Sequence, residues 1–160
     1  MNIFSLRIFG DPVLRQQAST IENIDEELSR LAASMIRTMN EVNGAGLAAP
    51  QVGVLKRMYT YDMGDGPRTL INPEIVESSG EYIYGEGCLS LPGLTVDILR
   101  PKIVTVRGVD LDGNEVIFEG DALMSRLIQH EIDHLDGVLL LDRLDPDQRR
   151  AALKEFHRLS

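Results

Sequence analysis

Residues 129–134 limit the possible folds and functions of this chain more than any other segment does. They contain the pattern His-Glu-x-x-His (HExxH) within a stretch of helical periodicity. Residues four apart lie on the same face of an α-helix, so His130 and His134 can direct their imidazole nitrogens at one metal ion. Glu131 follows the first histidine, where a carboxylate can accept the proton of a metal-bound water. The pattern therefore predicts a catalytic metal site.

The helix that carries this pattern is expected to be the buried centre of the fold. Leu123 and Leu127 share a stripe with the two histidines, and further apolar residues lie on the other sides of the helix predicted over 121–136. A helix that is apolar nearly all round is a buried one. The imidazoles would therefore project into the interior, and Gly137 is expected to cap the helix.

Two further helices are predicted. Residues 25–42 carry apolar side chains at helical spacing behind Asp25, which is a favourable N-cap residue. A last amphipathic helix is expected to begin at Pro146. The segment 44–53, which is small and rich in alanine, is expected to form a structured loop.

The middle of the chain predicts short strands separated by turn residues. Pro73, Pro92 and Pro101 are expected at strand ends or bends, because proline cannot donate to a ladder. The predicted strands cover 57–61, 69–71, 75–78, 81–84, 102–109 and 115–118. We therefore expect an α+β fold with mixed or antiparallel β-sheets packed around the central helix, in a single catalytic domain spanning residues 1–160.

Composition and charge exclude several classes of protein. The net charge of −9 over 160 residues argues against a surface built to bind DNA. No apolar run is long enough to cross a bilayer, and residues 1–7 contain no long apolar stretch of a signal peptide. We expect a cytoplasmic protein of the bacterial type; an organellar protein is the alternative if a transit peptide has been removed.

The third metal ligand is best supplied by Cys88, the single cysteine of the chain. A catalytic zinc-type site needs three protein ligands and one open position. Gly87 lets the backbone approach a ligand, and a thiolate suits a borderline-soft divalent ion. The alternatives are that Cys88 is a buried structural residue and that His157 is the ligand. His157 lies in a polar tail and is better explained as a surface histidine.

Three blocks of sequence together resemble the peptide deformylase family. They are Gly-Ala-Gly-Leu-Ala-Ala-Pro-Gln at 44–51, Glu-Gly-Cys-Leu-Ser at 86–90 and Gln-His-Glu-Ile-Asp-His-Leu at 129–135. Residues 10–15 and 141–143 are also similar to family members, so the resemblance covers almost the whole chain. It implies a hydrolase of protein biosynthesis that removes the N-formyl group from the N-terminal formylmethionine of nascent polypeptides and releases formate.

The resemblance implies the roles of the metal site. Cys88, His130 and His134 would hold one divalent ion per chain. Glu131 would take the proton of the attacking water and deliver it to the departing amine. The expected physiological ion is Fe(II), with Zn(II), Ni(II) or Co(II) as substitutes.

The resemblance also implies the substrate contacts. The side-chain amide of Gln51 and the backbone N–H of Leu89 would stabilise the oxyanion that forms during attack on the formyl carbon. Six other residues are expected to line the peptide and its methionine side chain: Gly44, Gly46, Gly87, Leu123, Arg126 and Leu127. Thr95 departs from the family pattern, where a larger residue often touches substrate, so contacts on that side are expected to differ.

Two further expectations concern charged residues. Family members usually keep both Glu86 and Arg100, which implies a buried ion pair that orients the loop around Cys88. The tail is locally basic through Arg149, Arg150, Lys154 and Arg158. The family resemblance implies a transient contact with the ribosome through this tail, as in similar proteins. An ordinary solvated helix is the alternative for the tail.

Two other functions compete with deformylation. A general metallopeptidase would need a third nitrogen or oxygen ligand after the helix, and the sequence offers no good one. A binding module or an inactive homologue would use the metal structurally, but structural zinc sites usually have four protein ligands. The three ligands and the retained Glu131 therefore favour a catalytic site.

Overall fold

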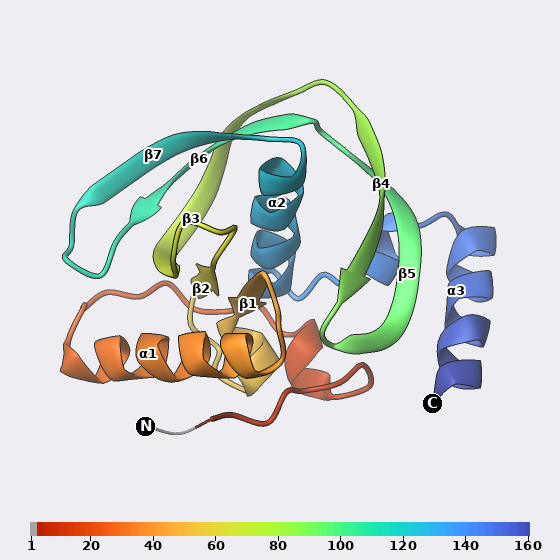
Figure 1. Ribbon diagram of the computed structural model, residues 1–160, viewed down its shortest axis with the longest axis horizontal. Coiled ribbons are helices and arrows are strands. Elements are labelled where there is room, and N and C mark those ends of the chain that lie inside the picture. The colour runs from red at the N-terminus through yellow and green to blue at the C-terminus, as the bar shows by residue number, and fades with distance from the viewer. Residues whose placement is uncertain (1–2) are drawn as a thin grey trace.

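Helix α2 (Leu123–Leu135) passes through the centre of the molecule and carries the HExxH pattern (Figure 1). Ten of its thirteen residues are buried, so the predicted central helix is confirmed. The chain turns sharply after it at Gly137, whose φ is 73°. A Cβ there would lie 2.7 Å from the carbonyl oxygen of Arg15, so the close approach of these two segments also requires glycine.

The computed structural model describes residues 3–160; Met1 and Asn2 of the predicted domain lie outside the described residues. Two antiparallel sheets flank α2. The larger has the strand order β1-β2-β3-β6-β7, and the smaller is the hairpin β4-β5. Their bounds are β1 (Gly46–Ala48), β2 (Met58–Tyr61), β3 (Arg68–Ser79), β4 (Tyr82–Cys88), β5 (Leu91–Arg100), β6 (Ile103–Val109) and β7 (Glu115–Asp121).

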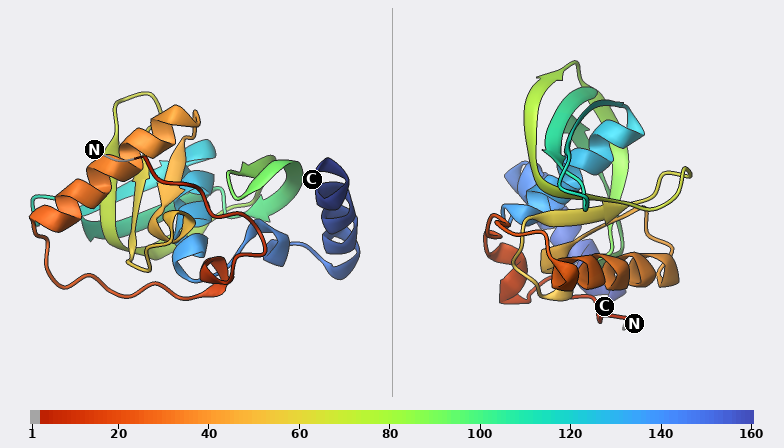
Figure 2. Two further views of the ribbon diagram at one scale, coloured as in Figure 1. Left: turned by 90° about the horizontal axis from the view of Figure 1, so that it is seen from below. Right: turned by 90° about the vertical axis from the view of Figure 1, so that its left-hand side faces the viewer.

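The other two helices lie toward opposite ends of the molecule (Figures 1 and 2). Helix α1 (Glu26–Glu41) packs on β1 and β2, and the side chain of Asp25 caps it by accepting a hydrogen bond from the N–H of Leu28, as predicted. Helix α3 (Pro146–Leu159) packs on β5. None of the helices in residues 3–160 has the length and apolar character needed to span a membrane.

Three apolar clusters hold these elements together. One fills the space between α2 and the five-stranded sheet, with Tyr59 and Ile128 among its buried members. A second lies beneath α1 around Met35. The third joins α3 to β5 through Phe156 and Leu91 and reaches the side chain of Cys88. The metal-ligand candidates therefore stand where the first and third clusters meet.

Several strand predictions were wrong. The segment 44–53, predicted as a structured loop, contains β1 and the 3-10 helix η2 (Ala49–Val52). Strand β5 was missed, although Pro92 lies at its beginning, as predicted, where the register with β4 is broken. The two strands predicted at 69–71 and 75–78 are one strand, in which Pro73 lies at a break in the register with β6.

Candidate active site

A cavity of about 530 Å³ opens between β1, the β4-β5 hairpin and α2. Eleven of the twelve site residues predicted from the sequence line this cavity. The exception is His134, which is 2% exposed and lies behind the cavity wall. Thr95 also contributes to the lining. The structure thus brings the three sequence blocks together at one place.

The three predicted metal ligands converge on one point. Cys88 ends β4, whereas His130 and His134 lie one turn apart on α2. The Sγ of Cys88 lies 3.3 Å from Nε2 of His134, and the Nε2 atoms of the two histidines are 3.2 Å apart. Ligand atoms around a tetrahedral ion with ordinary metal–sulfur and metal–nitrogen bonds are separated by roughly 3.3–3.6 Å. The three residues therefore fit one divalent ion.

The electrostatics of this cluster favour a thiolate. Burial raises the pKa of Cys88, but the imidazoles of His134 and His130 outweigh burial and hold that pKa well below its ordinary value. The backbone N–H of Ser90 also donates to the sulfur at 3.4 Å. The thiolate is the form of cysteine that binds metals.

Glu86 orients His130. Its Oε2 lies 2.7 Å from Nδ1 of His130, so Nδ1 carries the proton and Nε2 presents its lone pair to the cluster. Glu86 also receives two hydrogen bonds from Arg100, at 2.9 and 2.7 Å, which confirms the predicted buried ion pair. Burial raises the pKa of Glu86, but the hydrogen bonds from His130 and Arg100 hold it well below its ordinary value.

Glu131 lies against the edge of β1. An ideal Cβ on Gly46 would lie 2.7 Å from Oε2 of Glu131, so only glycine leaves room for this carboxylate. The side chain is 5% exposed, and burial raises its pKa above the ordinary value of a glutamate. A carboxyl group with a raised pKa accepts a proton more readily near neutral pH.

Hydrogen bonds hold both the oxygen and the nitrogen of the Gln51 side-chain amide. Its Oε1 accepts from the N–H of Ala48 at 3.0 Å, and its Nε2 donates to Oγ of Ser90 at 3.1 Å. Nε2 also lies 3.8 Å from Sγ of Cys88. The NH₂ group is therefore directed toward the cluster. Ala48 and Ser90, which hold this amide, were not predicted as site residues, although both stand in the blocks that carry the family resemblance.

Arg126 differs from the simple pocket residue that was predicted. It lines the cavity, but its guanidinium donates to Oε1 of Glu86 at 2.7 Å and to the carbonyl oxygens of Tyr82 and Ile98 at 2.6 and 2.9 Å. It also lies over the ring of Tyr82 at 5.3 Å. The charged end is thus bound to the β4-β5 hairpin, and the remaining surface is available to the cavity.

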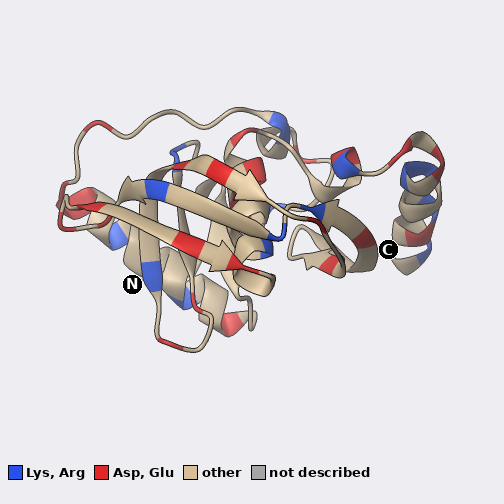
Figure 3. Cartoon of the chain, turned by 90° about the horizontal axis from the view of Figure 1, so that it is seen from above, with Lys and Arg blue, Asp and Glu red and all other residues tan. Residues whose placement is uncertain are grey.

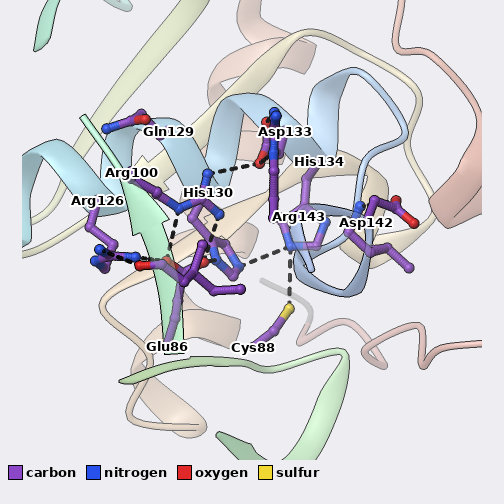
Figure 4. A network of polar contacts seen from close by, with 12 residues as sticks. Glu86, Cys88, Arg100, Arg126, Gln129, His130, Asp133, His134, Asp142 and Arg143 are labelled. Atoms are coloured by element: carbon purple, nitrogen blue, oxygen red, sulfur yellow. Dashed lines mark hydrogen bonds and ion pairs between the residues drawn. The ribbon is translucent and has the colours of Figure 1, made fainter. Parts of the chain in front are cut away.

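Asp133 and Arg143 join this polar network and were not predicted. Asp133 accepts hydrogen bonds from both Arg100 and Arg143 (Figure 4). The sequence contained a signal that could have identified Asp133, because it is a charged residue on a helix that is otherwise expected to be buried. His157 lies exposed on α3, as expected.

A thiolate and two imidazoles that fit one ion, together with a buried carboxylate one residue from a ligand, define a metal-dependent hydrolase. Comparisons with known proteins give the family. A family model described as Polypeptide deformylase matches residues 3–150. The peptide deformylase of Thermodesulfovibrio yellowstonii is 46% identical over 161 residues, 98% of each chain. That of Clostridium botulinum is 47% identical over 89% of this chain and 97% of its own.

Solved structures agree with this assignment. A peptide deformylase from Legionella pneumophila superposes with a TM-score of 0.91 at 39% identity, covering 99% of this chain and 97% of its own. One from Synechococcus elongatus, in complex with actinonin, has a TM-score of 0.91 at 41% identity, covering 96% and 86%. The chain belongs to the peptide deformylase family. Its activity is the metal-dependent removal of the N-formyl group from nascent polypeptides.

Proposed function

We propose that residues 1–160 form one catalytic domain in which Cys88, His130 and His134 hold the metal ion and Glu131 moves the proton. The observation that carries this proposal is the convergence of Sγ and two Nε2 atoms within 4.8 Å of one another at the wall of the cavity. Two of these three residues, Cys88 and His130, line the cavity. A set of three protein ligands beside a cavity would hold a catalytic ion, whereas structural sites usually have four protein ligands.

The ion would supply Lewis acidity, which lowers the pKa of the attacking water toward neutrality. Oε2 of Glu131 accepts the proton of that water and passes it to the departing amine nitrogen. Nε2 of Gln51 and the backbone N–H of Leu89 donate to the formyl oxygen as negative charge develops on it. Cleavage of the formyl C–N bond yields formate and a peptide with a free amino-terminal methionine.

The remaining lining residues are proposed to orient the substrate. Gly44, Gly46 and Gly87 leave room for the peptide backbone beside β1 and β4. Leu123, Leu127 and the methylene groups of Arg126 would contact the methionine side chain, since long charged side chains often present their apolar stems to a pocket.

We propose Fe(II) as the ion used in the cell. The support is the family resemblance, because thiolate and imidazole ligands also suit Zn(II), Ni(II) and Co(II). The site of action would be the cytoplasm of a bacterium, or an organelle if a transit peptide has been removed.

A transient contact with the ribosome through α3 is a weaker proposal. Three of its four cations are engaged: Arg149 pairs with Asp142, and the other two pairs lie within the helix. Figure 3 shows both signs of charge on α3. Reversing the charge of the exposed residues Arg150, Lys154 and Arg158 should abolish co-sedimentation with ribosomes if the contact exists. Unchanged co-sedimentation would refute it.

The reaction is tested by formate release from an N-formylmethionyl peptide. Metal-free protein would be reloaded anaerobically with Fe(II) or Ni(II). Wild type should release formate, Glu131→Ala should bind the metal without turnover, and Cys88→Ala should lose both. His157→Ala is the matched control and should behave as wild type, because this histidine lies on the surface of α3. Full activity in Glu131→Ala or Cys88→Ala would contradict the assigned roles.

A further inference from the structure

A run of polar contacts connects His130 to Arg143 through Glu86, Arg100 and Asp133 (Figure 4). His130 contacts Glu86, Glu86 contacts Arg100, and Arg100 donates to Oδ2 of Asp133 at 3.0 Å. Arg143 closes the run by donating to both oxygens of Asp133, at 2.5 and 3.1 Å. Each group between the two ends therefore has a hydrogen-bond partner on either side, and the charges of Glu86, Arg100, Asp133 and Arg143 alternate in sign.

Burial changes abruptly along this run. The side chains of Glu86, Arg100 and Asp133 are 5%, 4% and 9% exposed, whereas that of Arg143 is 47% exposed. Arg143 ends the 3-10 helix η3 (Leu140–Arg143). The run thus connects a surface arginine to the metal site through three buried ions.

The run also joins two separate parts of the fold. Cys88, Glu86 and Arg100 belong to the β4-β5 hairpin, whereas His130 and Asp133 belong to α2. The metal needs ligands from both parts, so their relative position decides whether three ligand atoms fit one ion. The bonds of Arg100 to Glu86 on one side and to Asp133 on the other fasten the hairpin to the helix.

A second cavity, of about 260 Å³, exposes the outer part of this run. Arg100, Asp133 and Arg143 line it together with Gln129, and it shares no lining residue with the substrate cavity. Arg143 itself therefore lies outside the lining of the substrate cavity. The effects of changing Arg143 should instead appear as changes in metal binding.

We propose that Arg143 is a positioning residue for the metal centre. By holding both oxygens of Asp133, it fixes the direction in which Asp133 meets Arg100, and Arg100 in turn holds Glu86 against His130. This inference rests on the proposed function, because it requires His130 to be a metal ligand. Groups that orient a metal-bound histidine directly change metal affinity by about 10–100-fold when removed, and Arg143 acts at a greater distance.

The test compares cobalt release from Arg143→Ala and Arg149→Ala. Arg149 is the matched control: it is 38% exposed and pairs at 2.7 Å with Asp142, a carboxylate of the same 3-10 helix that has no link to His130. Metal-free proteins would be loaded with Co(II), and the loss of the thiolate-to-cobalt absorption would be followed in excess chelator. We expect Arg143→Ala to release Co(II) about 3–10-fold faster than wild type, and Arg149→Ala to remain within about twofold.

Two further measurements separate positioning from general stability. Arg143→Lys should recover part of the slow release, because a lysine can contact Asp133 but cannot hold both oxygens in a fixed plane. The melting temperatures of the metal-free Arg143→Ala and Arg149→Ala variants should be similar, since each loses one partly exposed ion pair. The absorption bands of Co(II) should shift in Arg143→Ala alone.

Failure of the proposed ligand set and failure of the positioning role would give different results. Wild-type protein that binds Co(II) without a thiolate-to-cobalt band would overturn the proposed ligand set. A normal band in wild type, with release from Arg143→Ala at the wild-type rate, would overturn the positioning role alone. Equal acceleration in Arg149→Ala would also overturn it, because loss of any neighbouring ion pair would then suffice.

Discussion

The addition of one methyl group at Gly46 is expected to disable the reaction without unfolding the protein. The three atoms nearest to an ideal Cβ at this position all belong to Glu131: Oε2 at 2.7 Å, Cδ at 3.1 Å and Cγ at 3.2 Å. Ordinary van der Waals contact begins at about 3.4 Å, so the carboxylate has to retreat by about 0.7 Å. The methyl group therefore acts on the proposed proton carrier directly.

The size of the expected loss in kcat follows from this displacement of the Glu131 carboxylate. A displacement of about 1 Å in a reacting group can cost about 10²-fold in rate. For a slightly smaller displacement we expect kcat to fall by about 10–100-fold, which corresponds to roughly 1.4–2.7 kcal/mol in the activation free energy. The free energy of unfolding should change by less than about 1.5 kcal/mol, because alanine also restricts the unfolded chain relative to glycine.

The assay is steady-state formate release by the Ni(II) form, with kcat and KM resolved. Gly44→Ala provides the comparison, because the only close approach of its methyl group would be to the flexible end of Leu89, at 2.9 Å, while the carbonyl oxygen of Gly46 lies at an ordinary 3.6 Å; it should affect KM more than kcat. Glu131→Asp shortens the carboxylate and removes the clash, so the Gly46→Ala and Glu131→Asp effects should be strongly non-additive. A kcat of Gly46→Ala within threefold of wild type, or additive effects, would refute the reasoning.

Three other predictions concern stability. Burial raises the pKa of Asp142, but a backbone N–H and the guanidinium groups of Arg15 and Arg149 bring it below its ordinary 3.8. Its stabilisation is therefore complete well above pH 3.8 and lost as the pH falls through the lower folded value. Asp142→Asn should cost up to about 1 kcal/mol in urea unfolding at pH 7, and a difference that persists at pH 2.5 would contradict this. Met35→Ala, at a fully buried position beneath α1, should cost about 2–5 kcal/mol in the same assay, and a loss below 1 kcal/mol would argue against tight packing. The hydroxyl of Tyr59 is buried with no hydrogen-bond partner in residues 3–160, so Tyr59→Phe should be neutral or stabilise by about 1 kcal/mol; a clear loss would indicate a partner.

The helices could be predicted because their signals are local. Asp25 caps α1 through an atom three residues away, and the apolar pattern over 121–136 identifies α2 by itself. Strand β5 carries only a short alternation at Leu94, Val96 and Ile98, and its full length depends on pairing with β4, from Tyr82 opposite Arg100 to Cys88 opposite Leu91. Strand β1 is only three residues long and is recognisable as a strand only beside β2.

The residues of the candidate site also divide into those that the sequence could predict and those that it could not. The candidate ligands could be predicted, because spacing placed two of them on one helical face and Cys88, the single cysteine, suited the third position. The buried pair of Glu86 and Arg100 was also predicted, from the family resemblance. The partners of Asp133 could not be predicted, because they are set by tertiary structure. Arg100 meets Asp133 across 33 positions in sequence and Arg143 meets it across ten. A sequence shows that Asp133 is charged on a buried helix, but not which arginines neutralise it.

Arg126 shows how substrate binding and metal binding depend on one residue. A pocket for an uncharged methionine side chain should exclude a bare guanidinium, since burying an unpaired charge is costly. Here the guanidinium is turned to Glu86 and to two carbonyl oxygens, so only its stem remains for the cavity. Glu86 is in turn the group that orients His130. The contact of Arg126 with Glu86 therefore serves both proposed roles, the apolar pocket and the orientation of the candidate ligand His130, and a change that loosens one should loosen the other.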